Sequence, residues 1–323
     1  METVVSLAET LARWTGAAQE GGEPADSVES CVSHPRFVMM RWMGFLKTIL
    51  FLPRWRLLPL VFLILPGSVS GQNVGMPVAE ANALRSDLTG IVCDNEMRRQ
   101  AVRDLLAKHG AGEHEITSMA YKKVTNLAVE VPGTSPERVV VGAHYDKSRR
   151  GCGAIDNWSG IVILAHLYKA IRATKPNKTF VFVAFGREEE GLLGSKAMVD
   201  AIPKEERANY CAMVNLDSFG MGRPQVLENA STGKLTRLAQ AVARENDIPF
   251  ASGIAAGNSD SSSFRSKGIP AVTLHGLAGR FSEVLHSSAD TERAVNLGSV
   301  YLGYQFALLL VQRLDSCDCS ELR

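Results

Sequence analysis

Continuous apolar runs alternate with amphipathic stretches along the chain from residue 124 onward. Uninterrupted apolar runs are typical of strands covered on both faces, whereas apolar residues at helical spacing indicate helices with one buried side. The pattern predicts buried strands at 138–143, 178–185, 211–216 and 269–274. It predicts helices between them at 159–173, 193–201, 234–246 and 260–267, and a long closing helix at 296–314.

The region before the first buried strand adds one helical stretch and one further strand. Apolar residues at helical spacing predict helical structure over 78–110, ended by His109-Gly110. Alternating residues predict a strand at 124–131. Strands that alternate with helices predict an α/β three-layer sandwich, in which helices flank a mixed, mostly parallel sheet. We expect this domain to span residues 78–316.

The first 71 residues differ in character from the rest. Residues 1–39 are polar and aperiodic, which predicts a disordered or non-native extension, the latter if translation starts near Met40. Residues 40–71 place a basic flank, a short apolar core and small residues in the order of a secretory signal. The core is shorter than the ~20 apolar residues that span a bilayer. A cleaved signal is expected, with an uncleaved signal anchor as the alternative. Either one predicts a secreted, periplasmic or otherwise extracytoplasmic protein, which contacts a membrane only through such an anchor.

Composition excludes some classes of partner. The chain has 35 basic and 34 acidic residues and a net charge of +1, so no basic excess points to nucleic acid. The six cysteines fit no CxxC zinc pattern. Five of them follow residue 71, an odd number, so at least one is expected to be free or paired between chains: Cys93, Cys152, Cys211, Cys317 and Cys319.

Acidic and imidazole side chains follow the first two buried strands. His144 and Asp146 stand two apart on an extended segment and therefore point the same way, so that one can bind a metal while the other fixes its tautomer. Asp156 lies in a loop of small residues, Gly153-Ala-Ile-Asp-Asn-Trp-Ser-Gly160, and its two oxygens can bridge two metals. Glu188 and Glu189 follow the next strand, where one can bind metal and the other can accept a proton from water.

Two further side chains complete the candidate set. Asp217 follows the third buried strand, in Asn215-Leu-Asp217, and His286 lies in a polar loop before the closing helix. Each residue alone is compatible with an ordinary turn, cap or surface position. Together they lie where open α/β sheets build their sites, outside the carboxyl ends of the strands.

The successive motifs resemble those of the two-zinc aminopeptidases. The similar strings are His-Tyr-Asp, Gly-Ala-Ile-Asp-Asn-Trp-Ser-Gly, Glu-Glu-Glu-Gly-Leu-Leu-Gly-Ser, Asn-Leu-Asp and His-Ser-Ser-Ala-Asp-Thr, and the resemblance spans residues 80–315. That family includes secreted bacterial leucyl and Streptomyces-type aminopeptidases and, more distantly, glutaminyl cyclases. The resemblance implies a zinc exopeptidase fold and hydrolysis of the N-terminal bond of peptides or proteins by a metal-bridging hydroxide.

The resemblance also implies a role for each motif residue. The expected ligands of two Zn²⁺ ions per chain are His144, Asp156, Glu189, Asp217 and His286. Asp156 would bridge the ions, Glu188 would be the general base, and Asp146 would support His144.

Substrate contacts are expected from Asp260, Phe264 and Asp290, of which Asp290 is also placed to orient the His286 loop. Many family members have histidine after the aspartate that corresponds to Asp260, whereas this chain has Ser261. The sequence shows no clear tyrosine for the oxyanion. His275 follows the strand at 269–274, where it either borders the pocket or has a structural role.

Other functions share parts of this pattern. A glutaminyl cyclase is the main alternative, and a carboxypeptidase-like exopeptidase uses the same kind of metal site. Retention of all five ligands disfavours a non-catalytic receptor on the same fold. A serine hydrolase is disfavoured because the chain has no Gly-x-Ser-x-Gly elbow.

Overall fold

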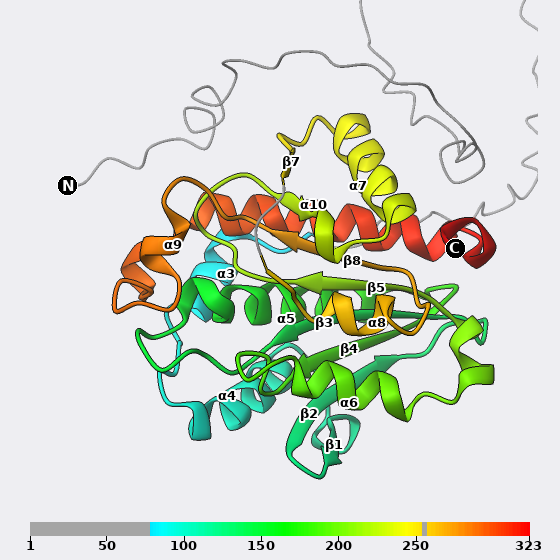
Figure 1. The fold of residues 1–323 in the computed structure, drawn as a ribbon, viewed down its shortest axis with the longest axis horizontal. Helices are drawn as coiled ribbons and strands as arrows, with labels where there is room; N and C mark the ends of the chain where they lie inside the picture. The colour runs from blue at the N-terminus through cyan, green and yellow to red at the C-terminus, as the bar shows by residue number, and fades with distance from the viewer. Residues whose placement is uncertain (1–77, 254–256) are drawn as a thin grey trace, which may run out of the picture. The chain divides into compact units, whose positions relative to one another are not determined.

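A computed structural model describes residues 78–253 and 257–323 of the chain. The predicted extension at 1–39 and the predicted signal at 40–71 lie outside these ranges. One eight-stranded sheet runs through the described part in the order β1-β2-β4-β3-β5-β8-β6-β7 (Figure 1). The strands are β1 (Thr117–Tyr121), β2 (Val124–Val131), β3 (Arg138–His144), β4 (Thr179–Phe185), β5 (Tyr210–Leu216), β6 (Gln225–Leu227), β7 (Ala251–Gly253) and β8 (Ala271–His275).

The four central strands, β4, β3, β5 and β8, are parallel to one another. On either side of them, β2 pairs with β4 and β6 pairs with β8 in the antiparallel direction. The helices are α3 (Ala81–Leu88), α4 (Asn95–Lys108), α5 (Ser159–Arg172), α6 (Leu193–Ala201), α7 (Gly233–Glu245), α8 (Ser261–Arg265), α9 (Phe281–Val284) and α10 (Leu297–Ser316). The predicted three-layer α/β sandwich with a mixed sheet is confirmed.

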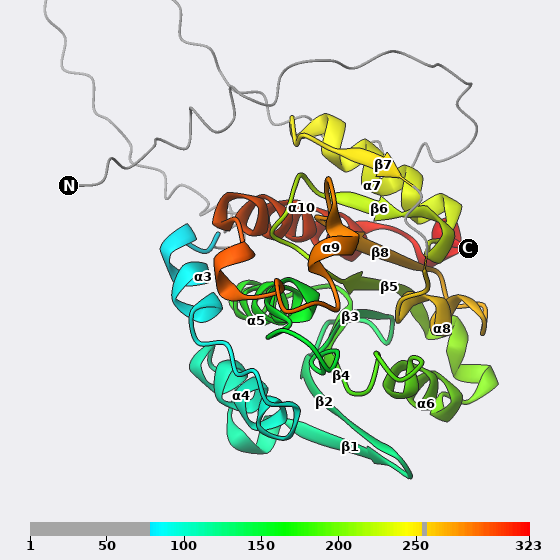
Figure 2. The ribbon, with the colours of Figure 1, turned by 60° about the vertical axis from the view of Figure 1, so that its left-hand side comes forward.

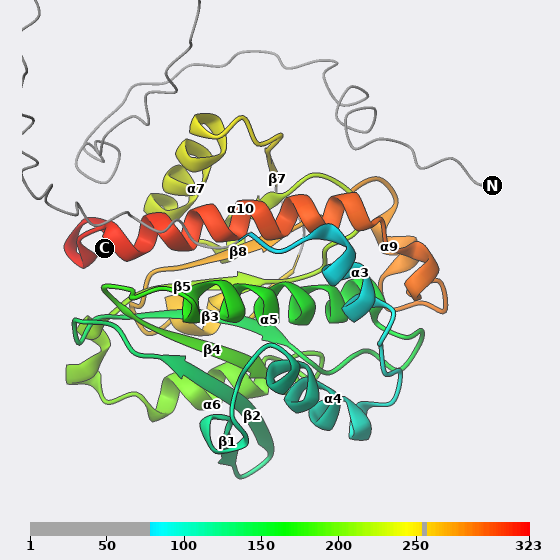
Figure 3. The same ribbon diagram turned by 180° about the vertical axis from the view of Figure 1, so that it is seen from behind.

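The two faces of the sheet carry different helices. Figure 3 shows α3, α4, α5 and α10 over one face, while α6 and α8 lie on the other, which faces the viewer in Figure 1. The larger core is made by α5 and α10 with strands β3 and β5, and the smaller one includes Met198 of α6 and Phe264 of α8. Because both faces are covered, β3, β4 and β5 are apolar along nearly their whole length.

The structure differs from the sequence prediction at the edges of the sheet. The short strands β1, β6 and β7 were not predicted, because three to five residues carry little periodicity. The helical stretch expected over 78–110 is two helices, α3 and α4. The segment between these two helices ends at Asp94, which caps α4 by accepting a hydrogen bond from the Met97 amide at 3.0 Å.

Disulfides join distant parts of the described chain. Cys93, before α4, pairs with Cys152, and Cys211, in β5, pairs with Cys319. No cysteine in the described ranges is free, and Cys317 is also disulfide-bonded. The expected leftover thiol is therefore not found there. The domain extends past the predicted end at residue 316, because Cys319 and Leu322 are buried in the larger core. Within 78–253 and 257–323, no helix combines the length and apolarity needed to cross a bilayer.

A buried polar cluster ties three helices together. The Asp87 carboxylate of α3 lies 2.8 Å from the Nε2 atoms of both His109 and His166, and it also contacts Lys108. The Asp87 carbonyl oxygen accepts a hydrogen bond from the Trp158 indole at 3.0 Å. Burial alone would raise the pKa of the Asp87 carboxyl, but these hydrogen bonds outweigh it and hold that pKa well below its usual range.

We predict that Asp87→Asn lowers the free energy of unfolding by about 3 kcal/mol, because it leaves buried groups without their charged partner. Asp104→Asn, an exposed position on α4, is the matched control and should change it by less than about 0.5 kcal/mol. Urea denaturation followed by circular dichroism measures both. Equal stability of the two variants would contradict a stabilising role for the buried Asp87 cluster.

The same cluster predicts acid sensitivity. Burial lowers the pKa of His166 below its usual value despite its hydrogen bond to Asp87. The unfolded chain therefore gains a proton near pH ~6.5 that the folded chain does not, and stability falls as the pH decreases through that value. The urea midpoint of the wild type relative to that of His166→Gln should therefore decrease from pH ~7.5 down to pH ~5, since this comparison isolates the contribution of His166.

Candidate functional site

The candidate residues meet beyond the carboxyl ends of the central parallel strands. His144 ends β3, Asp217 directly follows β5, and Glu188 and Glu189 lie a few residues after β4. In Figure 2 this side of the molecule has turned forward, with α9 beside the ends of β5 and β8. His286 follows α9 and so reaches the same place.

Asp156 is shared between two groups of potential ligands. Its Oδ1 lies 3.1 Å from His144 Nε2, which is in turn 3.6 Å from Asp217 Oδ1. Its Oδ2 lies 3.1 Å from His286 Nε2, which is also 3.1 Å from Glu189 Oε2. Within each group the ligand atoms lie within 4.8 Å of one another. Two imidazoles and three carboxylates in this arrangement suit two zinc ions that share one carboxylate.

The loop of Asp156 is held from two sides. The Asp290 carboxylate accepts hydrogen bonds from the amides of Ile155 at 2.7 Å and Asp156 at 3.2 Å. The next residue, Asn157, donates to the Leu216 carbonyl at 2.8 Å and accepts from the Ser218 amide at 3.0 Å. These bonds fix the position of Asp156 relative to the end of β5, where Asp217 lies.

The Asn157 side chain lies so close to the backbone of residue 160 that only glycine fits there. Its Oδ1 accepts a hydrogen bond from the Gly160 amide at 3.1 Å, and a Cβ at Gly160 would lie 2.3 Å from that oxygen. This close approach explains the glycine in the motif better than backbone flexibility does.

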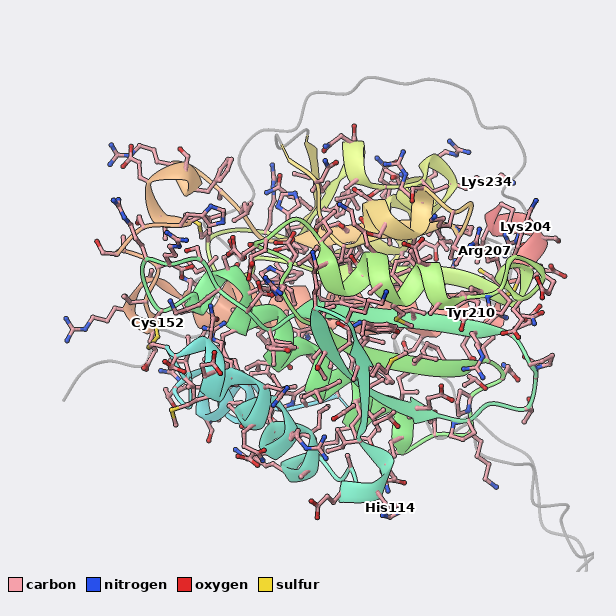
Figure 4. The ribbon with its side chains drawn as sticks, turned by 60° about the horizontal axis from the view of Figure 1, so that its bottom comes forward. His114, Cys152, Lys204, Arg207, Tyr210 and Lys234 are labelled. Carbon is pink, nitrogen blue, oxygen red and sulfur yellow. A yellow bond between two sulfur atoms is a disulfide. The ribbon has the colours of Figure 1, made fainter. Side chains whose placement is uncertain are left out.

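Arg98 of α4 is a supporting residue that the sequence did not reveal. Its side chain is 0% exposed and its guanidinium donates to four backbone carbonyls: those of Val92, Tyr145, Cys152 and Gly153. The disulfide between Cys93 and Cys152 joins the same two segments, and Figure 4 shows Cys152 beside α4. Arg98 thus fixes both the residue before Asp146 and the start of the Asp156 loop. Sequence spacing gave no signal for it, since Arg98 lies in an ordinary charged helix.

Asp146 lies next to His144 but contacts it mainly through its backbone. His144 Nδ1 is 3.1 Å from the Asp146 carbonyl oxygen and 3.7 Å from its carboxylate. The carboxylate instead accepts hydrogen bonds from the amides of Glu188 at 2.9 Å and Glu189 at 3.1 Å. Asp146 therefore positions the two glutamates, while its carbonyl directs the Nε2 atom of His144 toward Asp156 and Asp217.

The carboxylates are crowded together, and their mutual repulsion shifts their pKa values. Burial and the carboxylates of Asp260 and Asp217 raise the pKa of Glu188 to about 10. Burial and Asp156 raise the pKa of Glu189 to about 7. Burial would lower the pKa of His144, but the surrounding carboxylates raise it well above its usual value. The Oε1 atom of Glu189 is buried without a hydrogen-bond partner. Positive ions between these groups would relieve the repulsion, so the residues present fit a zinc centre.

The predicted substrate residues lie behind the site. Phe264 is fully buried against Phe185, with ring centroids 6.1 Å apart. Asp260 is fully buried too, and burial raises its pKa to about 7. Asp290 supports the Asp156 loop. None of the three lines the cavity, so this placement favours supporting roles over substrate contact. Ser261, at the position of the family histidine, bonds to the Ala230 carbonyl at 2.8 Å and to Thr273 at 2.6 Å.

A cavity of about 200 Å³ opens at the candidate metal centre. His144, Asp156, Glu188, Asp217 and His286 line its polar side. The sequence did not reveal its apolar wall, because those residues come from separate loops: Leu227, Leu277, Phe281 and Leu285. His275 and Thr273 of β8 also line it, with Ser218, Gly257 and Asn258, so His275 borders the cavity.

Fold and site together define a metallopeptidase of the zinc exopeptidase class. The chain belongs to peptidase family M28, whose model matches residues 126–305. The predicted family resemblance is therefore confirmed.

Individual relatives are similar over part of their length. Aminopeptidase YwaD of Bacillus subtilis is 30% identical over 154 residues, which cover 47% of this chain and 30% of YwaD. The structure of a zinc aminopeptidase from Bacillus subtilis has a TM-score of 0.55 and 22% identity, covering 61% of this chain and 52% of that one. The structure of a glutaminyl cyclase from an Acidobacteriales bacterium has a TM-score of 0.64 and 15% identity, covering 77% of this chain and 99% of that one. These structural likenesses establish the fold.

We predict that Arg98→Met weakens zinc binding by about 10- to 100-fold, the usual effect of losing support behind metal ligands. Loss of its carbonyl contacts should also destabilise the fold by at least about 1–3 kcal/mol. Competition with a zinc chelator and thermal melting measure the two effects. Arg99→Met, on the exposed side of the same helix, is the control. Unchanged zinc affinity in Arg98→Met would contradict a role behind the site.

Proposed function

We propose that this protein is an exported aminopeptidase that holds two zinc ions and hydrolyses N-terminal peptide bonds. The position of Asp156, with one oxygen toward each group of ligands, is the observation that carries the proposal. His144 and Asp217 would hold one ion, and Glu189 and His286 the other. When bound, such a pair of ions lowers the pKa of an attacking water and polarises the scissile carbonyl.

Glu188 is the candidate general base. It lines the cavity but belongs to neither ligand group, so its carboxylate is available to accept a proton from water. Burial and the neighbouring carboxylates raise the pKa of Glu188, and cations held beside it would lower that pKa again and leave the side chain ionised, as a general base requires. The protonated Glu188 can then deliver that proton to the leaving amine. Asp146 holds the Glu188 amide and so fixes the direction of its side chain.

The cavity supports recognition of a free N-terminus. One of the zinc ions at this end of the cavity would hold the free α-amine of a peptide through its nitrogen. The apolar wall of Leu227, Leu277, Phe281 and Leu285 can pack against an apolar first side chain. The disulfides Cys93–Cys152 and Cys211–Cys319 support export, since such bonds persist in oxidising compartments.

The metal and the base are tested together. The purified protein should contain about two zinc ions per chain, lose activity on leucine p-nitroanilide when chelated, and regain it with zinc. Glu188→Gln should keep the zinc and lose activity by about 10²- to 10⁴-fold. Glu190→Gln, the exposed neighbour paired with Arg187, is the control and should remain active. One zinc per chain with cyclisation of N-terminal glutamine would instead identify a glutaminyl cyclase.

Substrate choice follows from the contacts that the cavity offers. Leucine and phenylalanine anilides should be hydrolysed faster than those of aspartate and glutamate, because the wall that faces the first side chain is apolar. Acetylation of the α-amine should lower kcat/KM by at least about 30-fold, because an acetylated nitrogen does not bind a metal as a free amine does. Cleavage of an N-acetylated peptide from its free C-terminus would contradict this orientation and favour a carboxypeptidase.

A further inference from the structure

His275 is a buried side chain of the cavity to which the mechanism above gives no role. It ends β8 and is 5% exposed, and it lines the cavity together with His144, Glu188 and Asp217. Antiparallel pairing with Gln225 of β6 fixes its backbone. Its Nε2 atom is buried and has no hydrogen-bond partner in the described structure.

The tautomer of His275 follows from its other nitrogen. The Leu277 amide donates a hydrogen bond to Nδ1 at 3.3 Å, so Nδ1 acts as an acceptor. Burial lowers the pKa of His275 to about 4, and the ring is neutral at neutral pH. A neutral imidazole carries one proton, which must then be on Nε2. His275 thus holds a buried N–H donor without an acceptor.

An unpaired buried donor is energetically unfavourable, which makes it a candidate for pairing with a ligand. A donor cannot pair with the α-ammonium of a peptide, which only donates. The carbonyl oxygen of a peptide accepts hydrogen bonds and does not donate, so it is the group that can pair with this N–H.

Other buried side-chain donors in the described part of the lining are already engaged, and Asn258, which also lines the cavity, is exposed. The Ser218 hydroxyl donates to Asp217 at 2.9 Å. The Thr273 hydroxyl is shared with Ser261 at 2.6 Å, and the Asn215 amide approaches it at 3.4 Å. His275 is therefore the buried donor of this lining that lacks a partner.

We propose that His275 is a catalytic residue whose Nε2–H donates a hydrogen bond to the carbonyl oxygen of the scissile bond and to the oxyanion that forms from it. This inference rests on the proposed peptidase function. The proton stays on His275 throughout, so the residue stabilises charge and transfers nothing. A neutral imidazole suits this task because it needs no prior protonation.

Two substitutions of similar size separate hydrogen bonding from packing. His275→Met removes the donor, whereas His275→Gln keeps an amide N–H near the position of Nε2. The Met variant should retain zinc and lose kcat on leucine p-nitroanilide by about 10²- to 10³-fold, with KM little changed. The Gln variant should recover a large part of that loss. His114→Gln, at the exposed histidine labelled in Figure 4, is the control and should keep the wild-type kcat.

A measurement on the wild-type protein covers the case in which a variant fails to fold. Nitrogen-15 labelling of the seven histidines reports which nitrogen of each ring carries the proton. A His275 signal of the Nε2–H tautomer is expected at neutral pH, and an Nδ1–H tautomer would overturn the proposal. So would a zinc-loaded Met variant with unchanged kcat in an active enzyme. A wild-type protein that hydrolyses no aminoacyl substrate would overturn the proposed function. An active wild-type protein that fails either test of His275 would overturn only the role of His275, so the two failures can be told apart.

Discussion

The shared carboxylate of Asp156 is the constraint on which the rest of the site depends. It places one oxygen beside His144 and the other beside His286, two side chains that arrive from β3 and from the loop after α9. This concentrates negative charge in a buried place, where repulsion is weakly screened. Much of the surrounding structure serves to hold that arrangement. Asp290 binds the loop amides, Asn157 connects the loop to β5, and Arg98 provides a buried positive charge behind it.

Three of the five non-glycine residues with positive φ in the described ranges lie at the same place. Arg187, which precedes Glu188, has φ 57°, Ser218, which follows Asp217, has φ 64°, and His286 has φ 56°. Non-glycine residues adopt these left-handed values at a cost of ~1–3 kcal/mol each, which the surrounding contacts must offset. Two of the three residues adjoin a candidate ligand or base and the third is itself a candidate ligand. The strain therefore accompanies a precise placement of side chains.

The sequence predicted those parts of the structure that have a local signal. The apolar runs of β3, β4 and β5 located the sheet, and the polar residues after them located the candidate ligands. Features that depend on distant contacts were missed. Arg98 resembles any other helical arginine until the fold buries it, and the cavity wall combines loops around Leu227 and Phe281. Phe264 was expected at the substrate, but its apolar ring packs in the core on Phe185.

The most direct test of the central claim is anomalous diffraction at the zinc edge from crystals of the protein. Two peaks about 3.5–4 Å apart are expected, as in other two-metal sites. Each should lie about 2.0–2.2 Å from a different oxygen of Asp156. A single peak, or two peaks that do not share Asp156, would contradict that claim.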